Sequence, residues 1–514
     1  MNKFDLNLAK YIQEYAPISI DIVAAHFDKT RSTIAKSITK INQVIDKKDF
    51  INVDKQTIIT SFSYYGYTKL LNKLSLQHYR SSADERVKAL LVEMALNDVV
   101  NKKQFYTQFN VSQTTLKNDR KLFLDKLNKS VLGYETVAKK GLRLLGSENH
   151  IRILATQTLL NIVELDKDNQ LIEHLSNSPI NRLIAQCFLT NNAQYITQAV
   201  THYFQLEKQY AFQLSYNSKK FIIIYFSIAL NRMAQEKPLL FETFTTLTEQ
   251  NFTIFAEQDE NHLANQVISS LTWHNKYNCC DVLLTPLVET FVASVCADIR
   301  THIYSRRELF ADIYALIHSS LIQARLAITF SDKKLIDVKH HHAYAYDLVE
   351  RDISVIEEQM GIRLNETHLA TITMVIKRYI EQNKSIARRR TRIYLISNSS
   401  YNKLGYFIAK LKIHFHVEIV GIVNSNEIIH IPDEQYDVLI TFTNKISRYL
   451  SFHGKTSIKL NYQLKESDIQ TLKKFGLSRS ARKIPVDEFI AQIAQISQHE
   501  LKHFLSTEFN EFFV

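Results

Sequence analysis

Apolar residues recur at helical spacing along most of this 514-residue chain. In residues 98–152 the pattern predicts a short helix over Lys102–Phe109 and a longer one over Ser112–Leu127. Ser112 can begin the longer helix because its hydroxyl can accept hydrogen bonds from the first free backbone amides. The apolar side chains of that helix are predicted to share one face: Leu116, Phe123, Leu124 and Leu127.

The opposite face of this helix carries lysine, amide and hydroxyl side chains. Lysines can pair with phosphates, and Asn, Gln and Thr can bond to base edges in a DNA groove. Residues 134–145 are predicted to form a β-hairpin with Lys139-Lys140-Gly141 at its turn. Helix, turn, helix and basic hairpin in this order are typical of a winged helix-turn-helix; the alternative is an amphipathic helix beside a surface hairpin. The candidate DNA-binding residues are Gln113, Thr114, Lys117, Asn118, Lys121, Lys139 and Lys140.

Residues 4–60 repeat this design. The pattern predicts helices over Leu6–Glu14, Ser19–Phe27 and Arg31–Ile45, then a short hairpin over residues 50–59. The third helix has isoleucines along one stripe and polar residues opposite. Two such units in tandem are predicted to contact adjacent groove segments of one duplex, with Tyr64–Tyr79 as a helical connector. The candidate DNA-binding residues of this first unit are Arg31, Ser32, Lys36, Thr39 and Lys40.

The distribution of charge supports DNA binding. The chain has a formal net charge of +11, and residues 1–150 hold 24 Lys and Arg against 15 Asp and Glu, which places +9 there. If the lysines and arginines served only to keep the surface solvated, we would expect the excess charge to be spread along the whole chain. We therefore interpret this distribution as the electrostatic pattern of a nucleic-acid-binding region.

The rest of the chain changes character twice. Residues 151–382 show only helical patterning, over a length that suits two bundles, and the polar stretch 257–263 is the predicted boundary between them. After a basic linker at 382–392, short apolar strands alternate with helices, which favours a small parallel α/β domain. The strands are predicted at 392–396, 417–423, 436–442 and 457–460, and the helices at 402–414, 464–475 and 486–505.

These patterns together predict a multidomain, mainly α protein. It would contain tandem winged helix-turn-helix units, two helical bundles and a small C-terminal α/β domain. The predicted domains are residues 1–62, 63–150, 151–260, 261–384 and 391–514.

Composition narrows the class of protein further. The four cysteines (187, 279, 280 and 296) lack metal-ligand spacing, so we expect reduced core thiols in a cytoplasmic protein. No run of about 18 apolar residues exists, and the N-terminus lacks a signal-peptide core, so we expect no membrane partner. The run His340-His341-His342 cannot converge on one ion, because neighbouring helical residues diverge by about 100°. We expect no metal and no cofactor.

The order of the parts resembles the Mga/AtxA family of transcriptional regulators from Gram-positive bacteria. The segments NVSQTTLKNDRKLFLDKL and KKGLRLLGSENHIR carry the resemblance together with the architecture. More widely, the chain is similar to regulators whose helical domains are controlled by the sugar phosphotransferase system. The resemblance implies a cytoplasmic DNA-binding activator that is a homodimer or larger oligomer and is not an enzyme.

In that wider group, phosphorylated histidines of the helical domains decide activity. A typical pattern is a His followed seven residues later by an Arg, and IYALIHSSLIQARLAI in the second bundle matches it. The resemblance thus implies His318 as phosphate acceptor, Arg325 as phosphate clamp and a phosphocarrier protein as partner. The alternative is that His318 is structural. The second histidine of the pattern falls at Val375 here.

The first bundle keeps only part of this pattern. It has Arg232, but Tyr225 stands where the family often has a histidine. His202 and His274 lie in or near this bundle and are weaker candidates for phosphorylation.

The C-terminal domain resembles an enzyme IIB of the phosphotransferase system. Such enzymes carry a cysteine in a phosphate-binding loop after the first strand. Here that loop is Ser397–Ser400, and no cysteine exists beyond Cys296, so a phosphocysteine cannot form. The resemblance then implies a non-catalytic domain that serves dimerisation or signal reception.

Three other functions stay open at this point. An RNA-binding antiterminator of the same wider group would begin with a small β-rich domain, whereas this chain begins with helical patterning. A phosphotransfer enzyme would need the missing cysteine or a Gly-rich phosphate loop. A signalling scaffold would use the N-terminal units for protein contacts without binding DNA.

Overall fold

The structure is a computed structural model that describes residues 1–109, 111–210, 213–237, 251–273, 281–298, 306–330, 335–383, 391–432 and 435–475, with a few single positions between and after these ranges. Helices dominate it, and the sheets are small. The prediction of a mainly helical chain with a small parallel sheet is confirmed. The predicted helix at 486–505 and most of the predicted linker at 382–392 lie outside the described residues.

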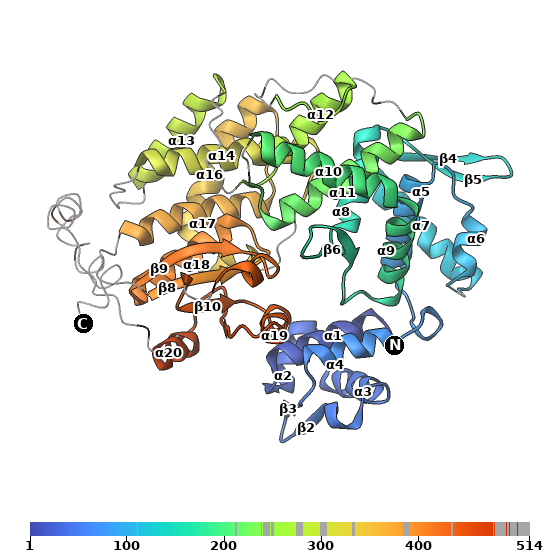
Figure 1. The fold of residues 1–514 in the computed structure, drawn as a ribbon, viewed down its shortest axis with the longest axis horizontal. Coiled ribbons are helices and arrows are strands. Elements are labelled where there is room, and N and C mark those ends of the chain that lie inside the picture. The colour runs from blue at the N-terminus through green and yellow to red at the C-terminus, as the bar shows by residue number, and fades with distance from the viewer. Residues whose placement is uncertain are drawn as a thin grey trace.

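The helices are numbered in chain order as in Figure 1. They are α1 (Lys3–Tyr15), α2 (Ile20–Phe27), α3 (Arg31–Asn42), α4 (Tyr64–Lys73), α5 (Ala83–Leu96), α6 (Lys102–Thr107), α7 (Gln113–Lys129), α8 (Glu148–Leu159), α9 (Pro179–Asn191), α10 (Ala193–Tyr210), α11 (Tyr216–Ala234), α12 (Gln258–Ser269), α13 (Leu284–Asp298), α14 (Arg306–Arg325), α15 (Ile336–His341), α16 (Ala343–Met360), α17 (Glu366–Asn383), α18 (Tyr401–His414), α19 (Asn444–Phe452) and α20 (Glu466–Lys474).

Within the described residues, the strands form three small antiparallel sheets and one parallel sheet. Their bounds are β1 (Ile18–Ser19), β2 (Asn52–Asp54), β3 (Thr57–Ile59), β4 (Gly133–Val137), β5 (Gly141–Leu145), β6 (Val163–Leu165), β7 (Leu171–Glu173), β8 (Thr391–Ile396), β9 (Val417–Val423), β10 (Val438–Thr441) and β11 (Ile458–Lys459). The antiparallel orders are β1-β3-β2, β4-β5 and β6-β7, and the parallel order is β11-β10-β8-β9.

We call residues 1–62 the N-terminal unit and residues 63–150 the second unit. In the N-terminal unit, α3 ends at Asn42, three residues before the predicted end. The Asn42 side chain makes two 2.9 Å hydrogen bonds with the backbone of Ile51. These bonds hold the chain in a reversal that leads into β2, so the helix does not continue to Ile45. Buried apolar side chains from Leu6 to Ile380 form one connected core, so both units share their core with the helices that follow.

Two predictions for the helical region were wrong. Residues 163–173 form the hairpin β6–β7 rather than helix, because the Asp166 carboxylate accepts 2.8 Å hydrogen bonds from the amides of Asp168 and Gln170 and closes a tight turn. The polar stretch 257–263, which was predicted as a break, includes the first turns of α12. Its Glu260 is buried against Arg152, so this stretch is part of a helix and not a break in the helical structure.

The parallel sheet has a separate core on each face. Along β8, Ile393 and Leu395 join the core under α18, while Tyr394 and Ile396 join the core under α19. This alternation is what period-two side-chain direction requires of a central strand covered on both sides. Helix α19 was missed by sequence reasoning, which placed no element between the third and fourth strands.

The C-terminal α/β part lies against both the helical region and the N-terminal unit. Figure 1 shows α18 beside α17, and α19 above α1. At Gly405 of α18, an added Cβ would lie 2.8 Å from Cδ of Arg378 in α17, so the glycine permits this close packing. None of the described helices is both long enough and apolar enough to span a bilayer.

Candidate nucleic-acid interface

Helix α7 has the start that the sequence predicts. The Ser112 hydroxyl accepts a 3.2 Å hydrogen bond from the amide of Thr115. Phe123 and Leu127 are buried and Leu116 is partly buried, but Leu124, which was predicted on the apolar face, is 36% exposed. Leu124 follows Phe123 directly, so it points about 100° away from the core.

A buried ion pair orients α7. Asp119 is fully buried in the inward face of the helix, and its two carboxylate oxygens accept hydrogen bonds from Nε and Nη2 of Arg86 in α5, at 2.7 and 2.8 Å. This bidentate geometry fixes the rotation of α7 about its own axis. Sequence reasoning missed both residues, although an acidic residue three positions after Leu116 and four before Phe123 was the available signal.

The predicted contact residues of α7 all lie on its outer surface. The side chains of Gln113, Thr114, Lys117, Asn118 and Lys121 are exposed. Arg120 is exposed as well and was not among the candidates; it donates a 3.4 Å hydrogen bond to the Tyr134 hydroxyl of β4. The outer face of α7 is therefore a polar surface with an additional cation.

The hairpin β4–β5 places two lysines at its tip. Lys139 and Lys140 are exposed. Behind them, Gly141 has φ of +150°, and a Cβ at this position would lie 2.1 Å from the carbonyl oxygen of Val100. Leu142 exchanges two 2.9 Å backbone hydrogen bonds with Val100, which attaches the turn end of strand β5 to the segment before α6. Figure 1 shows β4–β5 projecting away from the body of the molecule.

A third cation of the hairpin is already neutralised. Arg143 of β5 is 2.9 Å from both Asp98 and Glu135. Asp98 also pairs with Lys237 at 2.7 Å. Burial would raise the pKa of Asp98, but its hydrogen bonds from Lys237 and Arg143 lower it overall. The free positive charge of the hairpin is thus confined to its tip.

The N-terminal unit presents α3 in a similar way. Thr30 caps the helix, and Ser37 on its inner face donates a 2.6 Å hydrogen bond to the buried Asp5 of α1. The predicted contact residues Arg31, Ser32, Lys36, Thr39 and Lys40 are all exposed. Arg31, however, forms a two-pronged contact with Asp21 of α2, so its guanidinium is engaged within the unit.

Asp84 connects the two units. Its carboxylate lies 2.8 Å from Lys126 of α7, 3.1 Å from Lys88 of α5 and 3.7 Å from Lys3 of α1. Burial would raise the pKa of Asp84, but hydrogen bonds from Lys126 and Lys88 more than offset this and hold it at about 2. The α3-bearing and α7-bearing units therefore share one ionised carboxylate.

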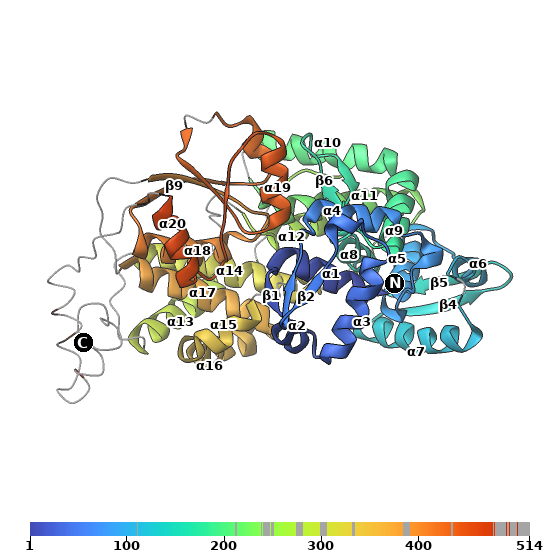
Figure 2. The ribbon, with the colours of Figure 1, turned by 90° about the horizontal axis from the view of Figure 1, so that it is seen from below.

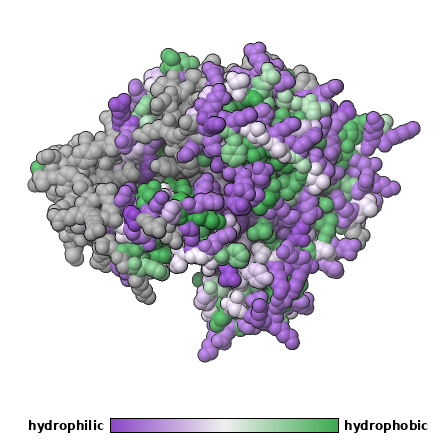
Figure 3. Space-filling model, viewed as in Figure 1, coloured by the Kyte–Doolittle hydropathy of each residue, from purple (hydrophilic) through white to green (hydrophobic). Residues whose placement is uncertain are grey.

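The two candidate helices lie in the same part of the molecule. In Figures 1 and 2, α3 and α7 both occur in the half that carries the N-terminus, with β2–β3 and β4–β5 at its periphery. Figure 3 shows the lower projection of the molecule, which is the N-terminal unit, covered mostly by hydrophilic residues. The candidate surface is thus polar and accessible in this arrangement.

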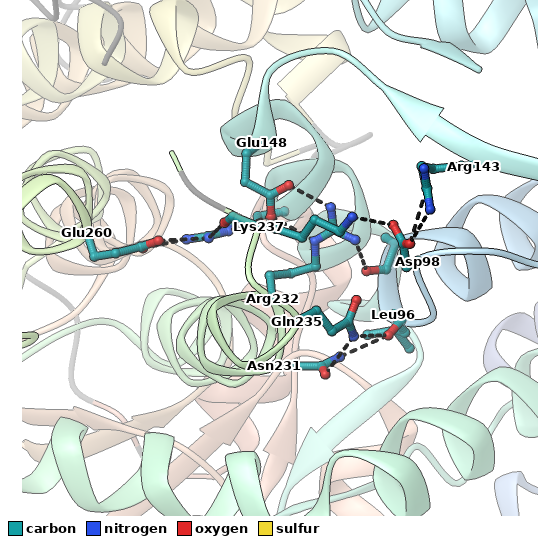
Figure 4. Close-up of polar contacts among 11 residues, drawn as sticks. Leu96, Asp98, Arg143, Glu148, Asn231, Arg232, Gln235, Lys237 and Glu260 are labelled. Atoms are coloured by element: carbon teal, nitrogen blue, oxygen red, sulfur yellow. Dashed lines mark hydrogen bonds and ion pairs between the residues drawn. The ribbon is translucent and has the colours of Figure 1, made fainter. Parts of the chain in front are cut away.

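A buried ionic core joins the second unit to the helical region. Arg232 of α11 donates to both carboxylate oxygens of Glu148 at 2.8 and 2.6 Å, and Arg152 of α8 donates to both oxygens of Glu260 at 2.5 and 2.8 Å. Figure 4 shows the side chain of Arg232 directed at Glu148. The resemblance implies that an arginine at the position of Arg232 would bind phosphate. In this chain Arg232 instead binds the Glu148 carboxylate and so has a structural role.

Polar side chains of α11 extend this core to α5. Asn231 and Gln235 donate hydrogen bonds of 3.1 and 2.7 Å to the carbonyl of Leu96, the last residue of α5, and Arg232 donates one of 3.2 Å to Ala95 (Figure 4). The last carbonyls of a helix have no partner within it. Helix α11 supplies those partners and so fixes the end of the helix against which α7 packs.

The candidate phosphorylation residues are mostly enclosed. His318 is 1% exposed, stacks on the ring of Tyr314 at 6.0 Å and lies in the wall of a cavity of about 1010 Å³ between α14, α17 and α18. Arg325 is exposed at the last residue of α14. His202 is half-buried, which lowers its pKa, and its ring lies 5.6 Å from Phe255. His274 lies outside the described residues.

One buried histidine was missed. His368 of α17 is seven residues before Val375, and therefore on the same side of the helix. Its Nε2 lies 3.1 Å from Oε1 of Gln323 in α14, and burial lowers its pKa to about 4. Its Nδ1 is buried without a hydrogen-bond partner in the part of the chain that the structure describes. The spacing from Val375 was the available signal.

The histidine run 340–342 and the cysteines were considered as possible metal ligands. Nδ1 of His341 lies 2.7 Å from the Asp337 carbonyl, and Nε2 of His342 lies 2.9 Å from the Tyr406 hydroxyl. Within the described ranges, no three His, Cys, Asp or Glu side chains are grouped to hold a metal ion. Cys187 is a free thiol, Cys296 is partly buried, and Cys279 and Cys280 lie outside those ranges.

No family model matches the chain, and no curated protein matches it significantly.

Removing one partner of the Arg86–Asp119 pair should loosen α7. We expect Arg86→Met to cost about 3 kcal/mol or more, because it leaves the Asp119 carboxylate buried without its partner. Amide exchange measured by mass spectrometry should then increase across α7. The matched control is Arg86→Met with Asp119→Leu, which removes both charges and should recover most of the protection. Unchanged exchange in the single variant would contradict this role.

The Asp84 contacts should make stability depend on acid. Since its pKa in the folded chain is lowered from 3.8 to about 2, the stabilisation is present above pH 4 and is lost as the pH falls toward 2. Asp84→Asn should therefore lower the thermal unfolding midpoint near neutral pH, and the difference from the wild type should shrink below pH 4. A difference that stayed constant from pH 7 to pH 2.5 would show that the Asp84 charge is not responsible.

Proposed function

We propose that this protein is a DNA-binding transcriptional regulator. The observation that carries the proposal is the outer face of α7, where Lys117, Asn118 and Lys121 are exposed beside a projecting hairpin with two lysines at its tip. The excess charge of +9 in residues 1–150 supports it. Lysines would neutralise phosphates, and the amide and hydroxyl side chains would bond to base edges.

The two units would act as tandem winged helix-turn-helix modules. In the second unit, α6 and α7 would be the helix pair and β4–β5 the wing; in the N-terminal unit, α2 and α3 would be the pair and β2–β3 the wing. The wing of the N-terminal unit has Asp54, Lys55 and Gln56 at its tip, with no net charge, and Arg31 is engaged by Asp21. We infer that the second unit contributes most of the affinity.

The order of parts supports the wider proposal that the chain is an Mga/AtxA-like activator. In this proposal it is cytoplasmic, assembles as a homodimer or larger oligomer, binds promoter DNA and is not an enzyme. The helical region would answer to the phosphotransferase system through a phosphocarrier protein, with His318 as acceptor and Arg325 as clamp. Because His318 is 1% exposed, α14 would have to move before a phosphoryl donor reached it.

Two alternatives make different predictions in one experiment. An RNA antiterminator would prefer a hairpin RNA to duplex DNA, but the helical start of this chain, α1 to α3, favours DNA. A signalling scaffold would bind neither nucleic acid. Competition between duplex DNA and hairpin RNA for the purified protein separates all three functions.

Neutralising the outer face of α7 should weaken DNA binding. We expect Lys117→Gln with Lys121→Gln to raise the Kd for duplex DNA on the order of tenfold and to reduce the salt dependence by about 2 released counterions, since two phosphate contacts are lost. The measurement is a fluorescence-anisotropy titration at two salt concentrations.

The matched control removes the same charge elsewhere. Lys167→Gln with Lys208→Gln changes exposed lysines on the β6–β7 turn and on α10, far along the chain from α7. This control should leave both the Kd and its salt dependence nearly unchanged. If both double variants weakened binding equally, the placement of α7 in a groove would be wrong and only net charge would matter.

A further inference from the structure

The C-terminal α/β part holds the end of helix α1. The backbone amide of Asn444, the first residue of α19, donates to the Glu14 carboxylate at 3.1 and 3.3 Å. The Asn444 side-chain amide donates to the carbonyls of Gln13 and Glu14 at 3.1 and 3.3 Å. Lys459 of β11 lies 3.0 Å from the Glu14 carboxylate and donates at 3.2 Å to its carbonyl. These contacts join positions about 430 residues apart in sequence.

The contact satisfies two helix ends at once. Helix α1 has no basic residue in its last turn, so Lys459 supplies the positive charge that stabilises the negative end of the helix dipole. In turn, the Glu14 carboxylate occupies the positive end of α19, where backbone amides have no partner within the helix. The Thr443 hydroxyl caps the amide of Ile446 at the same end of α19, and Glu14 accepts from the amide of Asn444.

The same end of α19 also contacts the helical region. Lys445, the next residue, is 3.3 Å from Oε2 of Glu164 in β6 and 3.1 Å from Nε2 of His174, which directly follows β7. Asn426 adds a 3.0 Å hydrogen bond to the carbonyl of Leu165. Adjacent residues of α19 therefore bind two different parts of the chain, and Figure 2 shows α19 at that junction, beside α4.

The start of α1 has a different anchor. The Met1 carbonyl accepts a 2.8 Å hydrogen bond from the amide of Arg80, and Lys3 pairs with Asp84 of the second unit. Helix α1 is thus held at one end by the second unit and at the other by the C-terminal part. Because α1 packs on α3 through the Ser37–Asp5 bond, these two anchors set the direction in which α3 faces.

We propose that the amino-terminal end of α19 is an intramolecular docking site for Glu14 that sets the orientation of the N-terminal unit relative to α7. This inference rests on the proposed function. The contact residues of α3 are exposed in the docked arrangement, so docking positions the unit and does not block it. An undocked unit would keep its apolar core with α4, the pairs of Asp46 with Lys69 and Lys73, and its anchors at Arg80 and Asp84. It would lose the contact at the far end of α1, so its orientation would be less firmly fixed before DNA binds. Docking therefore favours duplexes long enough to engage both units.

The test breaks the contact from opposite sides with opposite changes of charge. Glu14→Ala raises the net charge by one and Lys459→Ala lowers it by one, so a purely electrostatic effect would move the Kd in opposite directions. Docking predicts that both variants raise the Kd for a duplex of about 30 base pairs on the order of tenfold. Neither variant should alter the Kd for a duplex of about 12 base pairs by more than about twofold, because this duplex accommodates a single unit.

Amide exchange of the full chain gives an independent readout. Both variants should lose protection in the last two turns of α1 while α7 keeps its own. Asn444→Ala, which changes no charge and removes only the side-chain bonds, should show a smaller change in the same direction. Opposite shifts of the two Kd values, equal shifts on long and short duplexes, or unchanged exchange in α1 would each overturn the docking proposal. A wild-type protein that bound neither duplex would instead show that the proposed function is wrong, while the exchange experiment would still decide whether the contact exists.

Discussion

Buried charges hold the basic part of this protein to its helical body. The Arg86–Asp119 pair fixes α7 on α5, and the contacts of Arg232 with Glu148 and with the end of α5 fix α5 on α11. Leaving one such charge without its partner costs several kcal/mol. A rearrangement of the helical region therefore either carries α7 with it or breaks a buried ion pair, which makes this side of the molecule one mechanical unit.

The N-terminal unit shares the apolar core, but its polar contacts with the neighbouring parts are more exposed. Its contact with the C-terminal part uses Glu14 and Lys459, whose side chains are 18% and 29% exposed. Its ion pairs with the second unit use Asp84, which is 36% exposed, and Asp46, which is 31% exposed. Breaking an ion pair at such a partly exposed position costs far less free energy than leaving a buried charge without its partner. A conformational change between the two candidate DNA-binding surfaces would therefore break fewer buried charges at the N-terminal unit than at α7.

Local patterns predicted the elements well, and long-range contacts explain most of what was missed. The Ser112 cap and the hairpin tip at 139–141 follow from residues within a few positions of each other. The pairing of Asp119 with Arg86 depends on the contact between two helices. The position of Asp119 in an apolar stripe could therefore indicate a buried charge but could not identify its partner. The α19 contact with Glu14 joins opposite ends of the chain, and no local period encodes it. The β6–β7 hairpin is different, since its Asp-rich turn was visible in the sequence and was misinterpreted as part of a helix.

The most direct test of the account is the affinity of the purified wild-type protein for mixed-sequence duplex DNA at two salt concentrations, with the oligomeric state of the same sample measured by analytical ultracentrifugation. The account predicts duplex binding that weakens steeply as salt rises, because lysines of α7 and the β4–β5 tip release counterions from phosphates. A folded protein that showed no duplex binding even at low salt would contradict the regulator proposal and leave a scaffold or RNA-binding role.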